Sequence, residues 1–220
     1  MSPSAKRNLF VATAALLLLA FVAATLMHET GRQRSASAAV QANPEALARA
    51  HAPAFGNPKA KVHIVEFVDP ACETCAAFFP HVKKMMSMYP EQIRLSIRHV
   101  PFHPGADEVV RMLEAARVQG KYLETLETLY AGQAQWTRNH AVVPERAWQA
   151  IERVGLDLQQ LRRDMASPAL AERMARDMED ARALGVTKTP EFFVNGRALP
   201  TFGLAPLQEL VSEELDRQYP

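Results

Sequence analysis

The sequence predicts an α/β fold in which a helical block interrupts a sheet, preceded by an N-terminal apolar helix. Two stretches, 61–69 and 93–100, alternate along the chain and are rich in β-branched side chains, which indicates strands. From 106 to 184 the apolar residues recur with a helical period instead. A strand-turn-strand pattern and an amphipathic helix close the chain. The predicted order is therefore βαβ, a helical block, then ββα.

The N-terminal segment 1–28 is predicted to be a single-pass membrane anchor. Its run "NLFVATAALLLLAFVAATLM" carries no charge and follows Lys6 and Arg7. Twenty helical residues span about 30 Å, the hydrocarbon thickness of a bilayer. A cleaved signal peptide is the alternative, because "SASAA" offers a small-residue cleavage site. Lys6 and Arg7 favour a cytoplasmic N-terminus, so both readings export the rest of the chain into an oxidising compartment.

Residues 29–57 are predicted to form a linker, since they are small, polar and interrupted by proline, with at most a short helix over "PEALARA". The first part of the fold is expected over 58–103. It begins with the strand "KVHIVEFVD", continues with the helical pattern "CETCAAFFPHVKKMMSMY", kinked at Pro80, and ends with the strand "IRLSIRHV".

An inserted helical domain is expected over 104–184, with four or five short helices. Its breaks fall at Gly120, 137–144, 155–157 and Ser167-Pro168. The second part of the fold covers 185–220. There "EFFVNGRAL" predicts a hairpin, because Asn195-Gly196 is a strong type I′ turn signal, and "APLQELVSEELDRQY" predicts the closing amphipathic helix.

Composition excludes some functions. The chain has 25 Lys+Arg against 24 Asp+Glu and no dense basic patch, so a nucleic-acid partner is not expected. Two cysteines in 220 residues are too few for a disulfide-stapled scaffold. Any cysteine chemistry must come from the pair Cys72 and Cys75.

This pair stands where a strand pattern gives way to a helical one. The free N–H groups and positive dipole end of a helix N-terminus favour a thiolate, which is the form that attacks disulfides. Cys72 is therefore predicted to be the exposed nucleophile, and Cys75, one turn on, the more buried resolving thiol. A zinc site would need two further ligands at metal-binding spacing, and a structural disulfide would close only a very small loop. A redox dithiol is favoured over both.

Three motifs carry a family resemblance: "VEFVDPACETC", "PFHPGADE…AARVQGKY" and "GVTKTPEFFVNG". In this order they resemble the DsbA-like branch of the thioredoxin superfamily, thiol-disulfide oxidoreductases of the bacterial periplasm, over roughly residues 55–217. The resemblance implies a thioredoxin fold with a helical domain inserted after its second strand. It also implies a location on the periplasmic side of the bacterial inner membrane.

Glu66 lies in the middle of the first predicted strand, on the apolar face shared with Ile64 and Val68. An ionised carboxylate there costs several kcal/mol, so a reason is needed for its presence. It resembles the buried acid that family members keep below the active site, where it relays the proton that Cys75 gains or loses.

The resemblance also implies that the Thr189-Pro190 bond is cis and faces the cysteines, shaping the peptide-binding groove. Thr189 would offer backbone groups to an extended peptide added as a strand. Between the cysteines, Glu73 and Thr74 are expected to tune the thiol. The Glu73 carboxylate should repel the Cys72 thiolate and raise its pKa, although not above the free-thiol value of about 8.5.

The predicted function is that of an exported, membrane-tethered protein thiol-disulfide oxidoreductase, acting on client polypeptides with free thiols or disulfides. Oxidation is favoured, because isomerases of this superfamily usually carry an N-terminal dimerisation domain. A membrane redox partner, a monomeric state, no metal, and no cofactor beyond the Cys72–Cys75 disulfide are expected. The alternatives are a dedicated reductase, for example in cytochrome c assembly, and a non-catalytic chaperone or copper-binding protein.

Overall fold

The computed structural model describes residues 3–220. Met1 and Ser2, the start of the expected anchor, lie outside the described residues, as do the side chains of Lys6 and Arg7. The helices are α1 (Pro3–Ala42), α2 (Pro44–Leu47), α3 (Glu73–Met88), α4 (Ala106–Val118), α5 (Tyr122–Ala131), α6 (Gln133–Trp136), α7 (Pro144–Ile151), the 3₁₀ turn η1 (Glu152–Val154), α8 (Leu158–Met165), α9 (Pro168–Ala183) and α10 (Leu204–Gln218). The strands are β1 (Ala54–Gly56), β2 (Val62–Val68), β3 (Ile93–His99), β4 (Thr137–Arg138), β5 (Ala141–Val142), β6 (Glu191–Val194) and β7 (Arg197–Ala198).

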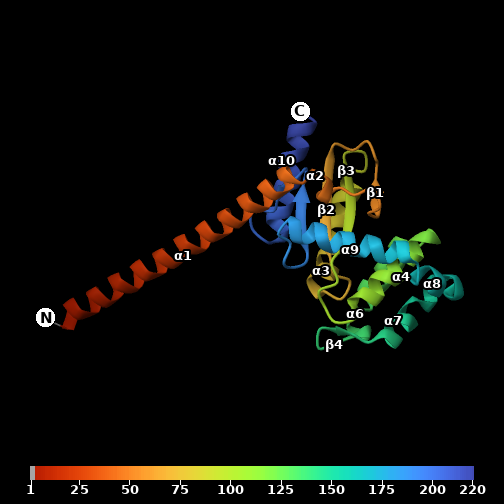
Figure 1. The fold of residues 1–220 in the computed structure, drawn as a ribbon. Coiled ribbons are helices and arrows are strands. Elements are labelled where there is room, and N and C mark those ends of the chain that lie inside the picture. The colour runs from red at the N-terminus through yellow and green to blue at the C-terminus, as the bar shows by residue number, and fades with distance from the viewer. Residues whose placement is uncertain (1–2) are drawn as a thin grey trace.

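The central sheet has the strand order β1-β3-β2-β6-β7, with β2 and β3 parallel and every other neighbouring pair antiparallel (Figure 1). The predicted hairpin is confirmed: Asn195 and Gly196 turn β6 into β7 with φ of 48° and 81°, the positive values that a type I′ turn requires. The predicted βαβ unit is also present as β2, α3 and β3. The order of elements is that of a thioredoxin-like α/β fold with a helical insertion.

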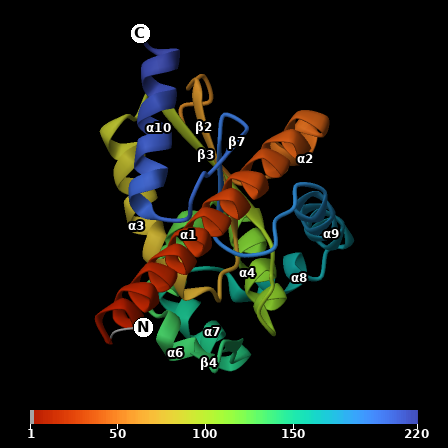
Figure 2. The same cartoon turned by 90° about the vertical axis from the view of Figure 1, so that its left-hand side faces the viewer.

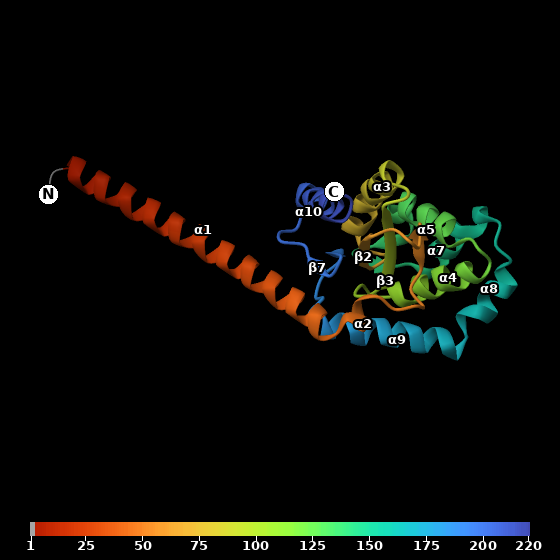
Figure 3. The same cartoon turned by 90° about the horizontal axis from the view of Figure 1, so that it is seen from above.

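Helices cover both faces of the sheet. Side chains of alternate strand residues point to opposite faces, so β2 divides its residues between two cores. Ile64 and Val68 pack with α3 and α10 and with the inserted helices, whereas Val65 and Phe67 pack with α9, α2 and the end of α1. Figure 3 shows α3 and α10 on one side of the sheet and α2 and α9 on the other.

The inserted helices α6 and α7 lie at one end of the molecule, opposite the C-terminus of α10 (Figure 2). The insertion was expected to span 104–184, but its last helix, α9, returns to the sheet and packs against β3. The expected break at 137–144 contains the short hairpin of β4 and β5. The inserted domain proper therefore runs from α4 to α8.

The expected division into an anchor (1–28) and a linker (29–57) differs from what is observed. A single helix, α1, continues to Ala42 and projects away from the rest of the molecule (Figure 1). Before Pro44 the chain offers only Gly31 as a helix breaker, and one glycine costs about 1 kcal/mol relative to alanine. The expected short helix is α2, and β1 adds a strand at the sheet edge.

Within residues 3–220, no helix combines the length and the apolar character needed to cross a membrane. The expected transmembrane anchor is therefore not confirmed. The end of α1 contacts the body of the protein, where Val40 is buried in the second core and Ser37 Oγ accepts a hydrogen bond from the Ala198 backbone at 3.3 Å.

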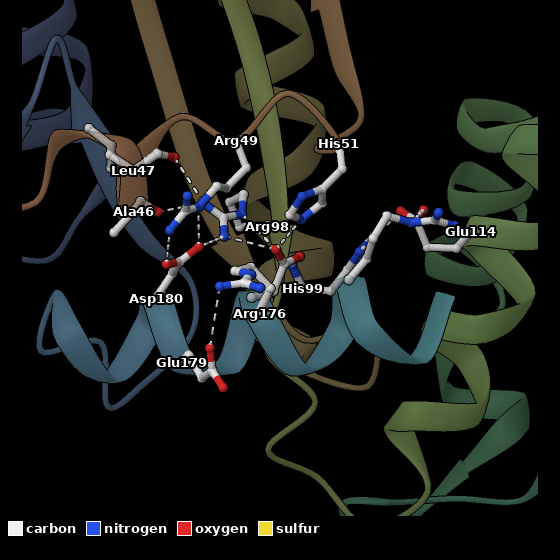
Figure 4. Close-up of polar contacts among 12 residues, drawn as sticks. Ala46, Leu47, Arg49, His51, Arg98, His99, Glu114, Arg176, Glu179 and Asp180 are labelled. Carbon is white, nitrogen blue, oxygen red and sulfur yellow. Dashed lines mark hydrogen bonds and ion pairs between the residues drawn. The ribbon is translucent and has the colours of Figure 1, made fainter. Parts of the chain in front are cut away.

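A buried arginine joins three segments on the α9 face (Figure 4). Arg98 of β3 is fully buried, and its Nε and Nη2 donate to Asp177 Oδ1 of α9 at 3.0 and 2.8 Å. Nη2 also donates to Asp180 Oδ2 at 2.6 Å. Nη1 donates to the carbonyl oxygens of Ala46 and Leu47, at 2.6 and 3.1 Å. Arg98 thus fastens both α9 and the segment around α2 to the sheet.

Two side chains from the segment just after α2 complete this network. Arg49 donates through Nε and Nη2 to Asp180 at 2.8 and 2.7 Å, and His51 Nε2 lies 2.6 Å from Asp177 Oδ1. Burial alone would raise the pKa of both carboxyls. The hydrogen bonds from His51 and Arg49 and the charge of Arg98 outweigh burial, so each carboxyl has a pKa below its ordinary value.

Candidate active site

The two cysteines lie at the start of α3, directly after the turn that leaves β2. Cys72 is the N-cap residue, with extended backbone angles (φ −78°, ψ 118°), and Cys75 lies in the first turn. Both are free thiols in this structure. Cys72 is only 7% exposed, so it is buried rather than exposed as predicted, but Cys75 is fully buried and Cys72 is the more accessible of the two thiols.

The two thiols have opposite electrostatic environments. The pKa of Cys72 is lowered to about 5, chiefly by a hydrogen bond from the Cys75 side chain. Burial raises this pKa. Hydrogen bonds from the side chain of Thr189 and from the backbone N–H groups of Cys75 and Thr74 lower it further. Burial raises the pKa of Cys75 well above its ordinary value, and the neighbouring Cys72 sulfur and Glu66 add to this. At neutral pH the pair therefore holds a stabilised thiolate at Cys72 and a protonated thiol at Cys75.

Glu66 lies on β2 with its side chain in the core that contains both cysteines. It is 1% exposed, and its neighbours across the sheet are Ile97 and Phe192. Among residues 3–220, its Oε2 has no hydrogen-bond partner. Burial, and secondarily the charge of Cys72, raises its pKa to about 8. Glu66 is thus a neutral acid at pH 7 that can exchange a proton near neutral pH.

Glu66→Gln is expected to stabilise the fold by about 1–3 kcal/mol at pH 7.5 and to slow proton transfer at Cys75. In the unfolded chain this carboxyl ionises near pH 4.5, whereas in the fold it keeps its proton up to about pH 8. Stability therefore falls as pH rises between these values, and glutamine removes that loss. The measurement is urea unfolding of the reduced protein at pH 5 and pH 7.5.

The control for this experiment is Glu73→Gln, which removes an exposed carboxylate from the residue next to Cys72 and should change stability little at either pH. A Glu66→Gln variant whose stability relative to wild type is the same at pH 5 and pH 7.5 would contradict the buried, protonated state of Glu66.

The Thr189-Pro190 bond is cis, as the resemblance implies, and immediately precedes β6. Cys72 Sγ lies 3.4 Å from the Thr189 carbonyl oxygen and, as a thiol, donates to it. The fold thus brings together two motifs more than a hundred residues apart. The role of Thr189 and Pro190 in binding an extended peptide stays a prediction.

Glu73 and Thr74 differ in how they meet the thiol. Thr74 contributes its backbone N–H to the low pKa of Cys72. The Glu73 side chain is 62% exposed and lies 3.4 Å from His140 Nδ1, at the turn between β4 and β5. The hydrogen bonds to Cys72 dominate its pKa, and the expected opposing effect of Glu73 stays a prediction.

Asp69 and His103 are site residues that the sequence analysis missed. Asp69 is fully buried; its Oδ1 accepts the Ala71 N–H at 2.8 Å and its Oδ2 accepts the His103 N–H at 2.7 Å. His103 Nδ1 also lies 2.7 Å from Oδ2, and Cys72 N–H donates to the Asp69 carbonyl at 3.1 Å. Asp69 therefore fixes the turn that presents Cys72. An aspartate two residues before a turn N–H is the sequence signal that could have indicated this role.

Among the described residues, no group of three or more His, Cys, Asp or Glu side chains is placed to hold a metal ion. The chemistry available at the site is that of two thiols of unequal acidity and a buried acid, beside the cis Thr189-Pro190 segment that precedes β6.

A family model described as Thioredoxin matches residues 49–212. A thioredoxin-like oxidoreductase from Silicibacter pomeroyi DSS-3 aligns in structure with a TM-score of 0.69 and 31% identity, over 81% of this chain and 99% of that one. The thiol-disulfide exchange protein alpha-DsbA2 from Wolbachia pipientis aligns with a TM-score of 0.68 and 17% identity, over 83% of this chain and 97% of that one, which shows a shared fold.

Among curated proteins, the Na(+)/H(+) antiporter NhaA of Herminiimonas arsenicoxydans is 34% identical over 144 residues, which are 66% of this chain and 22% of the antiporter. The chain thus spans about a fifth of the length of the curated relatives it matches. The family model covers most of the chain, and the solved structures share its fold. The chain therefore belongs to the thioredoxin family, and its 31% identical structural relative is a thioredoxin-like oxidoreductase.

Proposed function

We propose that this protein is an exported oxidoreductase that forms or exchanges disulfides in client polypeptides through Cys72 and Cys75. The observation that carries the proposal is the asymmetry of the two thiols. The pKa of Cys72 is lowered to about 5, whereas burial raises that of Cys75. This difference in pKa suits one attacking and one resolving thiol. The thiolate is the form that attacks a disulfide, and a sulfur of lower pKa is also the better leaving group when a mixed disulfide is broken.

In the oxidising direction, a client thiolate attacks Cys72 Sγ and breaks the Cys72–Cys75 bond. Cys75 leaves as a thiolate and takes a proton from Glu66, whose pKa of about 8 lies below that of Cys75. A second client thiolate then attacks the client sulfur of the mixed disulfide, and Cys72 leaves as a stabilised thiolate. The client gains one disulfide and loses two electrons, which reduce the protein to its dithiol form.

Oxidation of clients is favoured over their reduction. Because the pKa of Cys72 lies about two units below pH 7, ionisation of this thiol lowers the free energy of the reduced protein by roughly 3 kcal/mol at pH 7. For a two-electron couple this raises the reduction potential by on the order of 60 mV. The reduced protein must then be reoxidised, for which we propose a membrane redox partner.

The surface beside the cis peptide bond suits an unfolded polypeptide. Phe202 is 44% exposed. The centroid of its ring lies 5.1 Å from that of Phe78 in α3, and Lys188 Nζ lies 5.4 Å from the same Phe202 centroid. Lys188 is adjacent to Thr189, so this aromatic surface lies beside the segment whose carbonyl contacts Cys72. It offers apolar side chains of a client a place to pack, which supports polypeptides as the substrates.

Export is proposed from the sequence, because the uncharged run 8–27 follows Lys6 and Arg7. The protein would then act on the periplasmic side of the bacterial inner membrane, as a monomer, either tethered by this segment or released by its cleavage. The disulfide that the proposed chemistry requires would persist in that compartment.

The test is an exchange reaction between the oxidised protein and a reduced, unfolded client with two cysteines, together with a glutathione equilibrium that gives the reduction potential. Client oxidation and a potential well above the value of about −270 mV of thioredoxin are expected. A potential at or below that of thioredoxin would instead favour the dedicated reductase. A protein that exchanges no disulfide would favour the chaperone or copper-binding alternatives.

A further inference from the structure

The inserted helical domain reaches the cysteine turn through the side chain of Gln133. Gln133 is the first residue of α6 and is 6% exposed. Its Nε2 donates to the carbonyl oxygens of Pro70 and Cys72, at 2.8 and 3.1 Å. Both acceptors belong to the turn between β2 and α3. Both N–H groups of one amide are thus engaged on the backbone that presents the nucleophile.

The position of Gln133 is itself fixed. Trp136, at the other end of α6, is fully buried, and its Nε1 donates to the Leu129 carbonyl of α5 at 2.8 Å. Thr137 Oγ1 donates to the Gln133 carbonyl at 2.9 Å. A buried indole and a cap thus hold α6 in place, and a change in how the inserted domain packs would move the Gln133 amide.

The acceptor at Cys72 is the carbonyl that starts α3. It also accepts the first helical hydrogen bond, from Ala76 N–H at 3.2 Å. The orientation of the peptide group between residues 72 and 73 decides whether the N–H groups of Thr74 and Cys75 point at the Cys72 sulfur. A donor on this carbonyl holds that orientation and draws negative charge away from the sulfur, which favours the thiolate.

We propose that Gln133 is a positioning residue for Cys72: it holds the turn 70–72 so that the start of α3 solvates the thiolate, and it links thiolate stability to the docking of the inserted domain. The inference rests on the proposed function only in taking Cys72 as the attacking thiol. Asp69 holds the same turn from the sheet side, so the turn is fastened to both domains.

The test is Gln133→Met, which has a similar length but no N–H donor. The pKa of Cys72 is followed by thiolate ultraviolet absorbance in the reduced protein, and its reactivity by alkylation below neutral pH. We expect the pKa to rise by about 0.5–1 unit and alkylation at pH 5 to slow about two- to fivefold. Gln133→Asn, which keeps the amide but shortens its reach, should show a smaller shift in the same direction.

The matched control is Gln135→Met, an exposed glutamine on the same helix, which should leave the pKa and the alkylation rate unchanged. Urea unfolding of each variant reports packing separately. Lower stability with an unchanged Cys72 pKa in both Gln133 variants would overturn the inference, since it would make Gln133 a packing residue only. A wild-type protein that exchanges no disulfide, while Gln133→Met still shifts the pKa, would overturn the proposed function and support the positioning role.

Discussion

Cys72→Ser is expected to abolish disulfide exchange with clients, whereas Cys75→Ser is expected to accumulate clients in mixed disulfides. Cys72 is the more accessible sulfur and its pKa is lowered to about 5, so it is the sulfur that attacks and is attacked. Cys75 is fully buried beside the Cys72 sulfur. Without its sulfur, a mixed disulfide on Cys72 cannot be resolved from within the protein.

The measurement is the client exchange reaction, with non-reducing gels to detect mixed disulfides. The rate should fall by on the order of 10³-fold or more in Cys72→Ser, because a catalytic nucleophile is removed. Cys75→Ser should show client-sized adducts that disappear with reductant, and Cys72→Ser should show none. The opposite pattern, with adducts only in Cys72→Ser, would assign the attacking role to Cys75.

The sequence predicted the strands and the turn that carry local signals. Alternation marked β2 and β3, and Asn195-Gly196 marked the hairpin of β6 and β7. The strand β1 was missed because three residues are too few to show alternation; it exists because the edge of β3 pairs with it. The place of α9 was also missed, because helical periodicity gives an apolar face but not the surface that this face covers.

In the candidate site too, residues in local motifs were predicted and residues that act through long-range contacts were not. The two cysteines, Glu66 and the Thr189-Pro190 pair were predicted, because each is part of a contiguous motif. Gln133 was not, because its contacts are to backbone carbonyls about sixty residues away, and nothing in its neighbourhood in sequence marks them. Arg98 shows the same limit. In an alternating strand it looks like a solvent-facing residue, yet it is buried because α9 supplies two carboxylates.

Arg98→Met is expected to lower the free energy of unfolding by about 3–5 kcal/mol at pH 7, because it leaves Asp177 and Asp180 charged, buried and without their shared cation. It also leaves the carbonyls of Ala46 and Leu47 without a donor. Methionine keeps most of the side-chain length, so lost charge and hydrogen bonds, rather than lost volume, would dominate. Urea unfolding at pH 7 measures the effect.

The pH dependence of this stability difference distinguishes lost charge pairing from a packing defect. Both carboxyls have a pKa below the ordinary value of 3.8, so the stability they contribute is present above that pH and is lost as pH falls through the lowered values. The difference in free energy of unfolding between wild type and Arg98→Met should therefore narrow as the pH falls below 3.8. Arg94→Met is the control: Arg94 lies four residues earlier on β3, on the same face of the sheet, and is only half-buried, so its loss should cost about 1 kcal/mol or less. A gap that stays the same at low pH, or a cost at pH 7 no larger than that of Arg94→Met, would mean that Arg98 does not hold the α9 carboxylates in place.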